Sequence, residues 1–393
     1  MAEIYFDNSA TTKISEGAKS KMLKVMEECY GNPSSLHKMG LSAEKVVSEA
    51  RAAILSSLGV MRGVHGELVF TSGGTESNNL AILGVVNAKA RQGGEKILTT
   101  QGEHSSVENV LGELEKKGFT VLRVPTVAGE LDLEFIRKNA KGCILATFMC
   151  VNNETGALYD VKSAFEIVRE CSPSAVCHTD CVQAYMKTRV SKKALGADLI
   201  SLSAHKINGA KGTGALYIDP NVIKTKRICP IVFGGGQEWG YRSGTENVYG
   251  IAAFGEAVKE HTAHLSDEIG RMQELKDYIT SSLDAIEGVA VNKPVKSACH
   301  IVSVTVDGIR SETMLHFLSS LGIYVSSGSA CSSNEAHKAS PSLLSFGLSA
   351  DLADSTVRVS LCPDNTREEA DALIEGVRQG RMSLSKKASA YLQ

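Results

Sequence analysis

The sequence has few aromatic residues and no long apolar run. Phe, Trp and Tyr make up 5% of its 393 residues, with a single tryptophan, Trp239. No stretch of about 18 consecutive apolar residues occurs, which argues against a membrane-spanning helix. The first residues, MAEIYFDNSATT, show neither a basic start nor an apolar core with a small-residue cleavage site. We therefore expect a cytoplasmic protein with no membrane partner.

An excess of charge of either sign is also lacking. The chain has 42 Lys and Arg residues against 44 Asp and Glu residues, and its formal net charge is -2. No basic block follows the pattern of a surface that tracks a phosphate backbone. Nucleic acid is therefore not an expected partner. A chain of this length favours a large α/β domain with a smaller companion over one small core.

Cysteine is too sparse for a disulfide framework, with ten residues in the chain. Several cysteines lie within apolar runs, as reduced core residues do: Cys143, Cys150, Cys177 and Cys229. The tightest cluster is Cys171, Cys177 and Cys181. Its spacing fits neither a zinc ribbon nor a ferredoxin motif, so metal ligation is the less favoured alternative.

Histidine gives no better metal signal. His261 and His264 form a lone HxxH in a stretch, EHTAHLSDE, with the pattern of an exposed helix. The sequence near them supplies no third ligand. We therefore predict no metal site.

From about residue 67 to residue 219, short β-branched runs alternate with longer segments of helical period. This alternation predicts a mostly parallel sheet covered by helices. Strands are predicted at 68–72, 96–100, 120–125, 143–151, 175–180, 199–205 and 214–219, and helices at 75–92, 105–118, 131–140 and 161–171. Polar residues at the strand ends then stand where open α/β sheets bind ligands.

The pattern changes after residues 234–247, GGGQEWGYRSGTEN. A long amphipathic helix at 266–288, a strand at 300–308 and helices at 311–322 and 366–380 predict a smaller α+β domain. We place the boundary near residue 260. The large domain would then comprise 16–260, and the small domain 1–15 together with 261–393.

A lysine stands where one predicted strand ends and a glycine-rich turn begins. Ser203, Ala204, His205 and Lys206 close the strand at 199–205 and run into INGAKGTGALY. An amine at a strand end can meet a ligand. Taken alone, however, Lys206 fits an ordinary surface lysine better, so its neighbours decide the interpretation.

Other strand ends supply matching groups. Strand 68–72 ends in TSGGTES, where two glycines allow a tight turn and Thr75 opens a helix N-terminus suited to an anion. Asp180 ends another strand and can pair with the protonated nitrogen of a pyridine ring, with Gln183 in reach. Each feature alone also fits a simple turn or a capping residue. Together they favour pyridoxal 5'-phosphate over other common cofactors.

Motifs along nearly the whole chain resemble those of the cysteine desulfurases in the class V aminotransferase family, in the subgroup of nitrogen-fixation and housekeeping iron–sulfur enzymes. They are YFDNSATT (5–12), GNPSSLH (31–37), FTSGGTESNN (70–79), EH (103–104), VNNETG (151–156), HTDCVQA (178–184), SAHKINGAKGTGALY (203–217), GGGQEWGYRSGTEN (234–247), SSGSACSS (326–333) and VRVSL (357–361). The resemblance implies pyridoxal-phosphate fold type I, an α/β fold with a mostly parallel seven-stranded sheet in the large, cofactor-binding domain and a smaller α+β domain.

The resemblance also implies a role for each matching position. Lys206 would hold the cofactor as a Schiff base and remove the substrate α-proton, His104 would stack on its ring, Asp180 would pair with the ring nitrogen, and Gln183 would donate to the phenolic oxygen. The phosphate would be held by Gly74, Thr75, Ser203 and His205, with Thr245 reaching over from the second subunit of a homodimer. The substrate carboxylate would be oriented by Asn153 and Arg358, with Asn153 also near the cofactor, and Asn32 would line the same substrate pocket.

Cys331 lies in SSGSACSSNEAHKASPS, a run poor in apolar anchors, which predicts a mobile loop in the small domain. Alone, this cysteine fits an exposed bystander. In the family motif it is the catalytic nucleophile, beside Lys206 and His104, and takes sulfur from L-cysteine as a persulfide while alanine forms. The sulfur would pass to an acceptor, such as an iron–sulfur scaffold protein.

Two other functions stay open at this point. A selenocysteine lyase or cysteine sulfinate desulfinase would keep the fold and cofactor, and a catalytically silent protein could dock on a sulfur acceptor. The chain also departs from the usual motifs: Trp239 replaces an arginine, Ala210 a proline, and residues 334–340 read NEAHKAS. These departures leave the cofactor motifs intact but bear on the loop and the acceptor.

Overall fold

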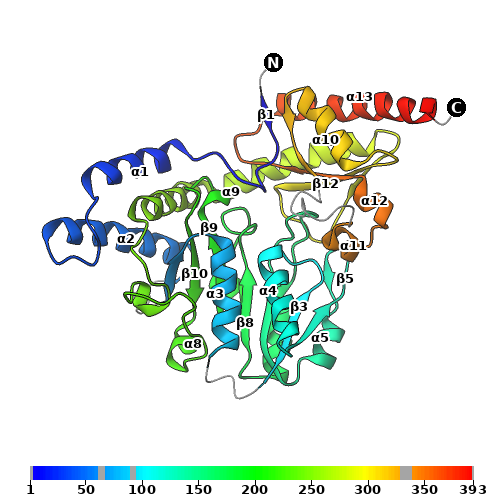
Figure 1. The fold of residues 1–393 in the computed structure, drawn as a ribbon. Coiled ribbons are helices and arrows are strands. Elements are labelled where there is room, and N and C mark those ends of the chain that lie inside the picture. Colours follow the sequence, from blue (N-terminus) through cyan, green and yellow to red (C-terminus); the bar gives the residue numbers. More distant parts are fainter. Residues whose placement is uncertain (1–2, 61–66, 89–93, 328–338, 392–393) are drawn as a thin grey trace.

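The computed structural model describes residues 3–60, 67–88, 94–327 and 339–391 (Figure 1). Its centre is a seven-stranded sheet in the order β2-β10-β9-β8-β7-β3-β4. Strand β10 is antiparallel to both of its neighbours, and the other pairs are parallel. The strands are β2 (Leu68–Thr71), β3 (Lys96–Thr100), β4 (Thr120–Val124), β7 (Cys143–Met149), β8 (Val176–Asp180), β9 (Leu199–Ser203) and β10 (Gly214–Ile218). The predicted sheet is confirmed.

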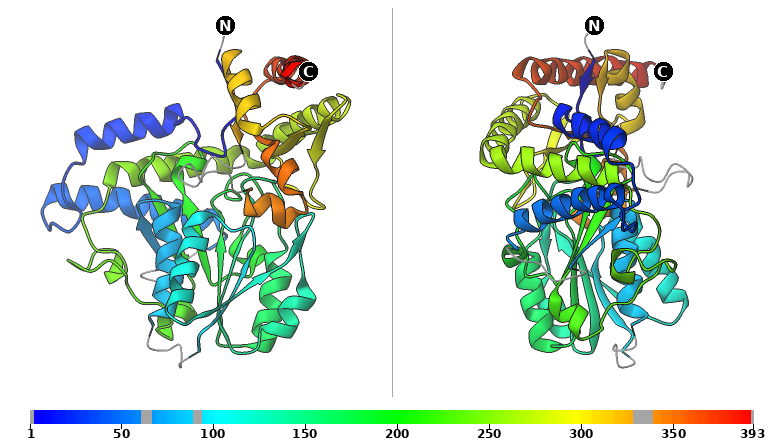
Figure 2. Two further views of the ribbon diagram at one scale, coloured as in Figure 1. Left: turned by 45° about the vertical axis from the view of Figure 1, so that its right-hand side comes forward. Right: turned by 90° about the vertical axis from the view of Figure 1, so that its left-hand side faces the viewer.

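Helices cover both faces of this sheet, as the turned views of Figure 2 show. Strands β2 and β7 to β10 are buried at every residue, so both faces of these strands are covered and apolar residues are not confined to one of them. The crossover helices are α3 (Gly74–Val86), α4 (Ser105–Lys116), α5 (Leu133–Asn139), α6 (Val161–Cys171), α7 (Lys192–Leu195) and α8 (Pro220–Lys224). Side chains of Asp132 and Asp160 cap α5 and α6 by accepting from backbone N–H groups.

Helix α9 (Val248–Asp284) runs through both halves of the molecule and packs against α1 (Glu16–Glu28), α2 (Lys38–Ser57) and α13 (Arg367–Tyr391). Our prediction of a helix at 266–288 missed its first part. There, residues from Val248 to Val258 are apolar or glycine except for Glu256 and are mostly buried, so no amphipathic pattern marks the helix.

The smaller sheet has the order β11-β12-β15-β14 and is antiparallel throughout. Figure 1 shows it above the large sheet, with α10 and α13 beyond it. Its strands are β11 (Val289–Asn292), β12 (Ile301–Val306), β14 (Ser326–Ser327) and β15 (Thr356–Ser360). The remaining elements are β1 (Ile4–Tyr5), which pairs with β13 (Ile323–Tyr324), the hairpin β5 (Thr126–Val127) and β6 (Glu130–Leu131), the helices α10 (Ser311–Ser320), α11 (Pro341–Phe346) and α12 (Ala350–Asp354), and the short 3-10 turns η2 (Ala204–Lys206) and η3 (Glu238–Gly240).

Helix α9 contributes to an apolar core of each sheet, and a further apolar cluster with Val69 and Leu80 also packs on the large sheet. Phe254 belongs to the core of the large sheet, whereas Ile279 belongs to that of the small sheet. Phe6 also packs into the small core, in line with assigning the N-terminal segment to that domain. The proposed boundary near residue 260 falls within the continuous α9, so the division into 16–260 and the rest stays a proposal. Among the described residues, no helix is both long and apolar enough to cross a membrane.

The structure changes the interpretation of one histidine. His261, predicted to be exposed, is 8% exposed, and its ring nitrogens lie 2.6 Å from Glu268 Oε2 and 3.1 Å from Asn208 Oδ1. It is therefore a packing residue of α9, whereas His264 is exposed as expected. In the described part of the chain every cysteine is free, and no group of three metal-ligating side chains occurs.

Candidate active site

A cavity of about 440 Å³ opens between the ends of the large-sheet strands and the small sheet. Residues that follow β2, β3, β7, β8 and β9 form one side of its wall, and residues of β14 and β15 form the other. Many predicted site residues line it together: Gly74, Thr75, His104, Asn153, Asp180, Gln183, Ser203, His205, Lys206 and Arg358. Residues far apart in the sequence thus meet because the carboxyl ends of parallel strands share one edge.

Lys206 ends the short turn η2 directly after β9. Its Nζ donates to the backbone oxygens of Ser9 and Ala10, at 2.6 and 2.7 Å. The lysine is thus held at the cavity wall by the N-terminal segment rather than extending into solvent. Gln183 binds the same segment, since its Nε2 donates to Ser9 O at 2.9 Å.

The start of α3 forms a cradle for an anion. The helix begins at Gly74, and Gly73 supplies no side-chain cap, so its first N–H groups are not taken by a capping side chain. A Cβ atom on Gly74 would lie 2.7 Å from Val182 Cγ2, so a side chain there would crowd the cradle. Ser203 Oγ is buried without a hydrogen-bond partner among the described residues.

Asp180 and His104 belong to one hydrogen-bonded network. The Asp180 carboxylate accepts from Val182 N at 2.9 Å and from Asn78 Nδ2 at 2.7 Å. Asn78 also donates to Ser106 Oγ at 2.9 Å, and this hydroxyl lies 2.8 Å from His104 Nδ1. The backbone N–H of Ser106 donates to the same ring nitrogen, so the neutral ring carries its proton on Nε2.

Burial controls the protonation of the two histidines in the wall. It lowers the pKa of His104, against a smaller opposing effect of the Asp180 carboxylate. It also lowers the pKa of His205 to about 4, and the nearby Lys206 charge acts in the same direction. Both rings are therefore neutral at pH 7.

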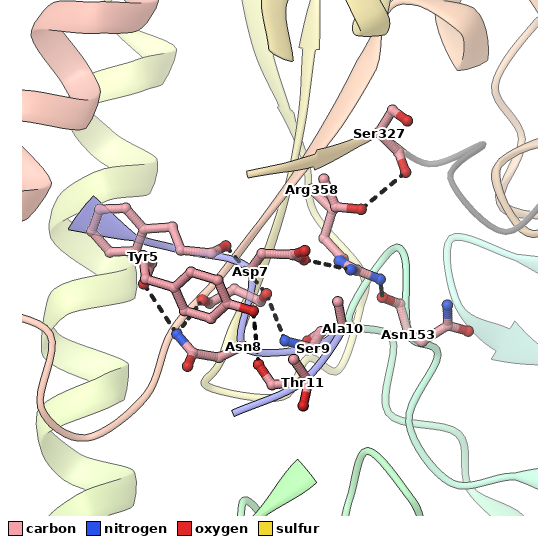
Figure 3. Close-up of polar contacts among 12 residues, drawn as sticks. Tyr5, Asp7, Asn8, Ser9, Ala10, Thr11, Asn153, Ser327 and Arg358 are labelled. Atoms are coloured by element: carbon pink, nitrogen blue, oxygen red, sulfur yellow. Dashed lines mark hydrogen bonds and ion pairs between the residues drawn. The ribbon is translucent and has the colours of Figure 1, made fainter. Parts of the chain in front are cut away.

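Arg358 reaches the cavity from β15 and is 7% exposed. Figure 3 shows its guanidinium between Asp7 and the backbone of Asn153. Nη2 donates to Asp7 Oδ1 at 2.8 Å, and Nη1 donates to Asn153 O at 2.9 Å. The arginine is thereby fixed from both sides of the cavity.

Comparisons with known proteins agree with this geometry. The family described as aminotransferase class-V matches residues 4–373. The chain belongs to the class V aminotransferase family. A protein from Lactobacillus delbrueckii subsp. bulgaricus named NifS/IcsS protein homolog is 39% identical, covering 94% of this chain and 95% of that relative. Cysteine desulfurase IscS 1 of Archaeoglobus fulgidus is 37% identical, with 94% and 95% covered. A solved NifS-like protein has a TM-score of 0.88 at 34% identity, with 96% of this chain and 99% of that chain covered.

The class V family uses pyridoxal phosphate, and the polar groups of the cavity match this cofactor. In this class V chain the cradle at Gly74, the unpartnered Ser203 Oγ and the Asp180 carboxylate match a phosphate at one end and a pyridinium nitrogen further in. Gln183 Oε1 is likewise buried without a partner among the described residues, and Nε2 retains a second hydrogen for a ligand. The donor set therefore fits the cofactor of the family.

Two predicted residues of the class V site, both in the described part of the chain, are not in the cavity wall. Asn32 is exposed, and its Oδ1 accepts from Ser34 N at 2.9 Å. Thr245 is also exposed, as a residue offered to a second subunit would be. Cys331 lies outside the described residues.

The substituted Trp239 makes its contacts within this chain. The Arg51 guanidinium lies 4.4 Å from the Trp239 ring and 4.6 Å from the Phe70 ring. The same guanidinium makes two hydrogen bonds to Glu238, at 2.8 and 2.9 Å. The family's usual arginine is thus replaced by an aromatic ring that packs on another arginine.

Sequence reasoning missed several residues of the wall. Asp7 and Ser9 lie in the quoted motif YFDNSATT, and Glu154 lies in VNNETG, yet the motifs alone gave no reason to assign them a role. Asn78 connects Asp180 with Ser106 from within FTSGGTESNN. The only available signal was the position of these residues inside family motifs.

Proposed function

We propose that this class V enzyme is a pyridoxal-phosphate-dependent cysteine desulfurase. It would convert L-cysteine to L-alanine and transfer the sulfur to Cys331 as a persulfide. The observation that carries the proposal is a single cavity that holds Lys206 and Asp180 on one side and Arg358 on the other. The near-full-length relatives named cysteine desulfurase support the same reaction.

The chain's own groups suit the cofactor. Gly74, Thr75, Ser203 and His205 would hold the phosphate, Asp180 would pair with the ring nitrogen, and Lys206 would attach the cofactor covalently. His104 would lie against the ring as a neutral imidazole, since burial lowers its pKa. Pyridoxal phosphate, when bound, supplies an electron sink that makes the substrate α-proton removable.

Each step then has a residue to perform it. Arg358 would bind the substrate carboxylate, because a guanidinium offers paired donors to two carboxylate oxygens. Lys206, as the neutral amine, would take the α-proton and hold it as an ammonium. The Cys331 thiolate would attack the substrate sulfur, so that an S–S bond forms and the C–S bond breaks with its electron pair left on carbon.

Cys331 stands four residues after Ser327, which lines the cavity. A chain extends at most about 3.6 Å per residue, so this separation allows a reach of roughly 14 Å from the wall. The proposed attack on a substrate held at Arg358 is within that reach.

The proposed partners follow from the reaction. L-Cysteine is the substrate, and a sulfur acceptor such as an iron–sulfur scaffold protein would collect the persulfide sulfur. We propose a cytoplasmic homodimer in which Thr245 of each chain completes the phosphate site of its neighbour. The exposure of Thr245 supports this arrangement.

The test is to incubate the cofactor-loaded enzyme with L-cysteine, quantify alanine, and locate the persulfide by intact mass and peptide mapping. We expect alanine, with the persulfide on Cys331. In a Cys331→Ala variant both should be lost, while Cys29→Ala, a change at a free and partly buried cysteine elsewhere in the chain, should retain both. Alanine formed without a persulfide would instead favour a lyase acting on selenocysteine or cysteine sulfinate. A wild-type protein that binds no cofactor would favour a silent docking protein.

A further inference from the structure

The N-terminal segment 5–11 contributes Asp7, Ser9 and Ala10 to the cavity wall and is anchored on the strand that carries Arg358 (Figure 3). Ser360 N donates to Phe6 O at 2.7 Å, and Ser9 N donates to Ser360 Oγ at 2.8 Å. Asp7 itself forms a parallel bridge with Ser360. Side chains two residues apart on a strand share a face, so Arg358 points to the same side as Ser360, toward the segment that carries Asp7.

The contacts of Arg358 leave one of its three guanidinium nitrogens without a partner among the described residues. A guanidinium has five N–H groups in a fixed plane, and here Nη1 and Nη2 are bound by Asn153 O and Asp7 Oδ1. Nε is buried and has no hydrogen-bond partner among the described residues. A buried donor without a partner is unfavourable, so a ligand that accepts from Nε is favoured.

We propose that Asp7 is a positioning residue for substrate recognition: it holds the Arg358 guanidinium so that the Nε edge faces the substrate carboxylate. The inference rests on the proposed function, in which Arg358 binds that carboxylate. Asp7 would not touch the substrate. It would act by keeping the arginine in one orientation before the substrate arrives, which lowers the ordering cost of binding.

Burial separates this ion pair from an ordinary surface contact. The side chains of Arg358 and Asp7 are 9% and 21% exposed, whereas exposed pairs are screened by water and contribute little. The backbone at Asp7 is bridged to Ser360, and Ser360 N donates to Phe6 O. Both partners of the ion pair are therefore attached to β15. A purely structural role for Asp7 would be to hold the N-terminal segment on β15, and the test distinguishes this role from substrate positioning.

The decisive comparison is between substrates with and without a carboxylate. In Asp7→Ala we expect the KM for L-cysteine to rise about tenfold with kcat changed less than about twofold, as for loss of a hydrogen bond to a charged group that orients bound substrate. The kcat/KM for L-cysteinamide should stay within about twofold of wild type, because this substrate offers no carboxylate to Arg358. As competitive inhibitors, L-alanine should bind more weakly to Asp7→Ala than to wild type, whereas L-alaninamide should bind equally to both.

Two further variants serve as rescue and control. Asp7→Asn keeps an oxygen that can accept from Nη2, so its KM should return to within about threefold of wild type. Glu3→Ala removes an exposed acid from the same segment, where it accepts from Tyr324 OH at 3.1 Å outside the cavity, and should leave KM unchanged.

If Asp7→Ala lowered kcat/KM equally for L-cysteine and L-cysteinamide, or weakened the binding of L-alanine and L-alaninamide equally, Asp7 would have a general structural role and the inference would be wrong. An unchanged KM for L-cysteine in Asp7→Ala would also overturn it. Failure of the proposed function would appear differently, as absence of alanine from wild-type enzyme with L-cysteine. The two inhibitors would still test Asp7 in that case, because their binding needs no turnover.

Discussion

Glu154 is an acid in the cavity wall whose environment disfavours its charge. Burial raises the pKa of this carboxyl to about 7, although the Ser340 hydroxyl, which donates to Oε2 at 2.6 Å, and the Arg358 charge act in the opposite direction. The unfolded chain would hold the same carboxyl near its ordinary value of about 4.3. The folded protein therefore retains a proton that the unfolded chain has lost.

This difference predicts how stability depends on pH. Because the folded state binds more protons between about pH 4.3 and 7, the free energy of unfolding should fall as pH rises through this range. Glu154→Gln removes that dependence. The free energy of unfolding of the variant minus that of wild type should therefore increase from pH 5 to pH 8, by at most about 3 kcal/mol. Urea unfolding at several pH values measures the difference.

Glu130→Gln is the control for Glu154→Gln. Glu130 is exposed in β6, so this substitution should leave the relative stability nearly constant over the same pH range. If the advantage of Glu154→Gln were constant, or grew toward acid pH, the assignment of a retained proton to Glu154 would be wrong.

At the scale of the elements, the N-terminus of α3 decides whether the cradle can hold a phosphate. Gly74→Ala would place a Cβ atom 2.7 Å from Val182 Cγ2, which requires the wall to move. We expect the affinity for pyridoxal phosphate to fall about tenfold or more, in line with loss of charge-assisted hydrogen bonds. Absorbance titration of the cofactor-free protein measures the change.

Gly112 in α4 offers a matched control, because nothing lies within 4 Å of a Cβ atom built there. Gly112→Ala should leave cofactor affinity unchanged and raise the free energy of unfolding by about 0.5–1 kcal/mol, since alanine favours the helix. A Gly74→Ala protein that bound the cofactor as wild type would show that the cradle is not the phosphate site.

The elements also show which parts of the site could be predicted from the sequence. Lys206, Asp180 and Thr75 each end or follow a strand with a clear pattern, and parallel strands bring such ends to one edge. Arg358 and Thr245 were assigned only through the family motifs. Asp7 has no local signal, because its contact with Arg358 joins positions 351 residues apart and depends on how β15 meets the N-terminal segment.

The ends of helices, like the Asp7 contact, could not be predicted from the local sequence. The predicted helix at 75–92 ends at Val86, because the N–H of Asn87 bonds to the oxygens of Leu83 and Val85 and tightens the last turn. In α9 the first turns are buried, so tertiary packing rather than amphipathicity defines where it begins.

At the scale of the whole molecule, α9 should make the two cores unfold together. Ile279 is fully buried in the small core, so Ile279→Ala should lower the free energy of unfolding by about 2–5 kcal/mol. Trp239, the only tryptophan, packs on Arg51 beside the large sheet and reports on that part of the molecule by fluorescence. The midpoints from fluorescence and from circular dichroism should therefore shift equally.

Phe254→Ala, a change in the large core on the same helix, should shift both signals in the same way. Two separate transitions, with the Trp239 signal unaffected by Ile279→Ala, would show instead that the cores unfold independently.

The anchoring of the N-terminal segment on β15 also sets an order of events during synthesis. Asn8 donates to the backbone oxygen of Ser360, a position 352 residues later, so a segment synthesised before the large sheet waits for a strand synthesised after it. The backbone oxygens of Ser9 and Ala10 that hold Lys206 take their places only when β15 is present. A nascent chain that lacks β15 therefore cannot assemble this cavity, and we expect it to be inactive.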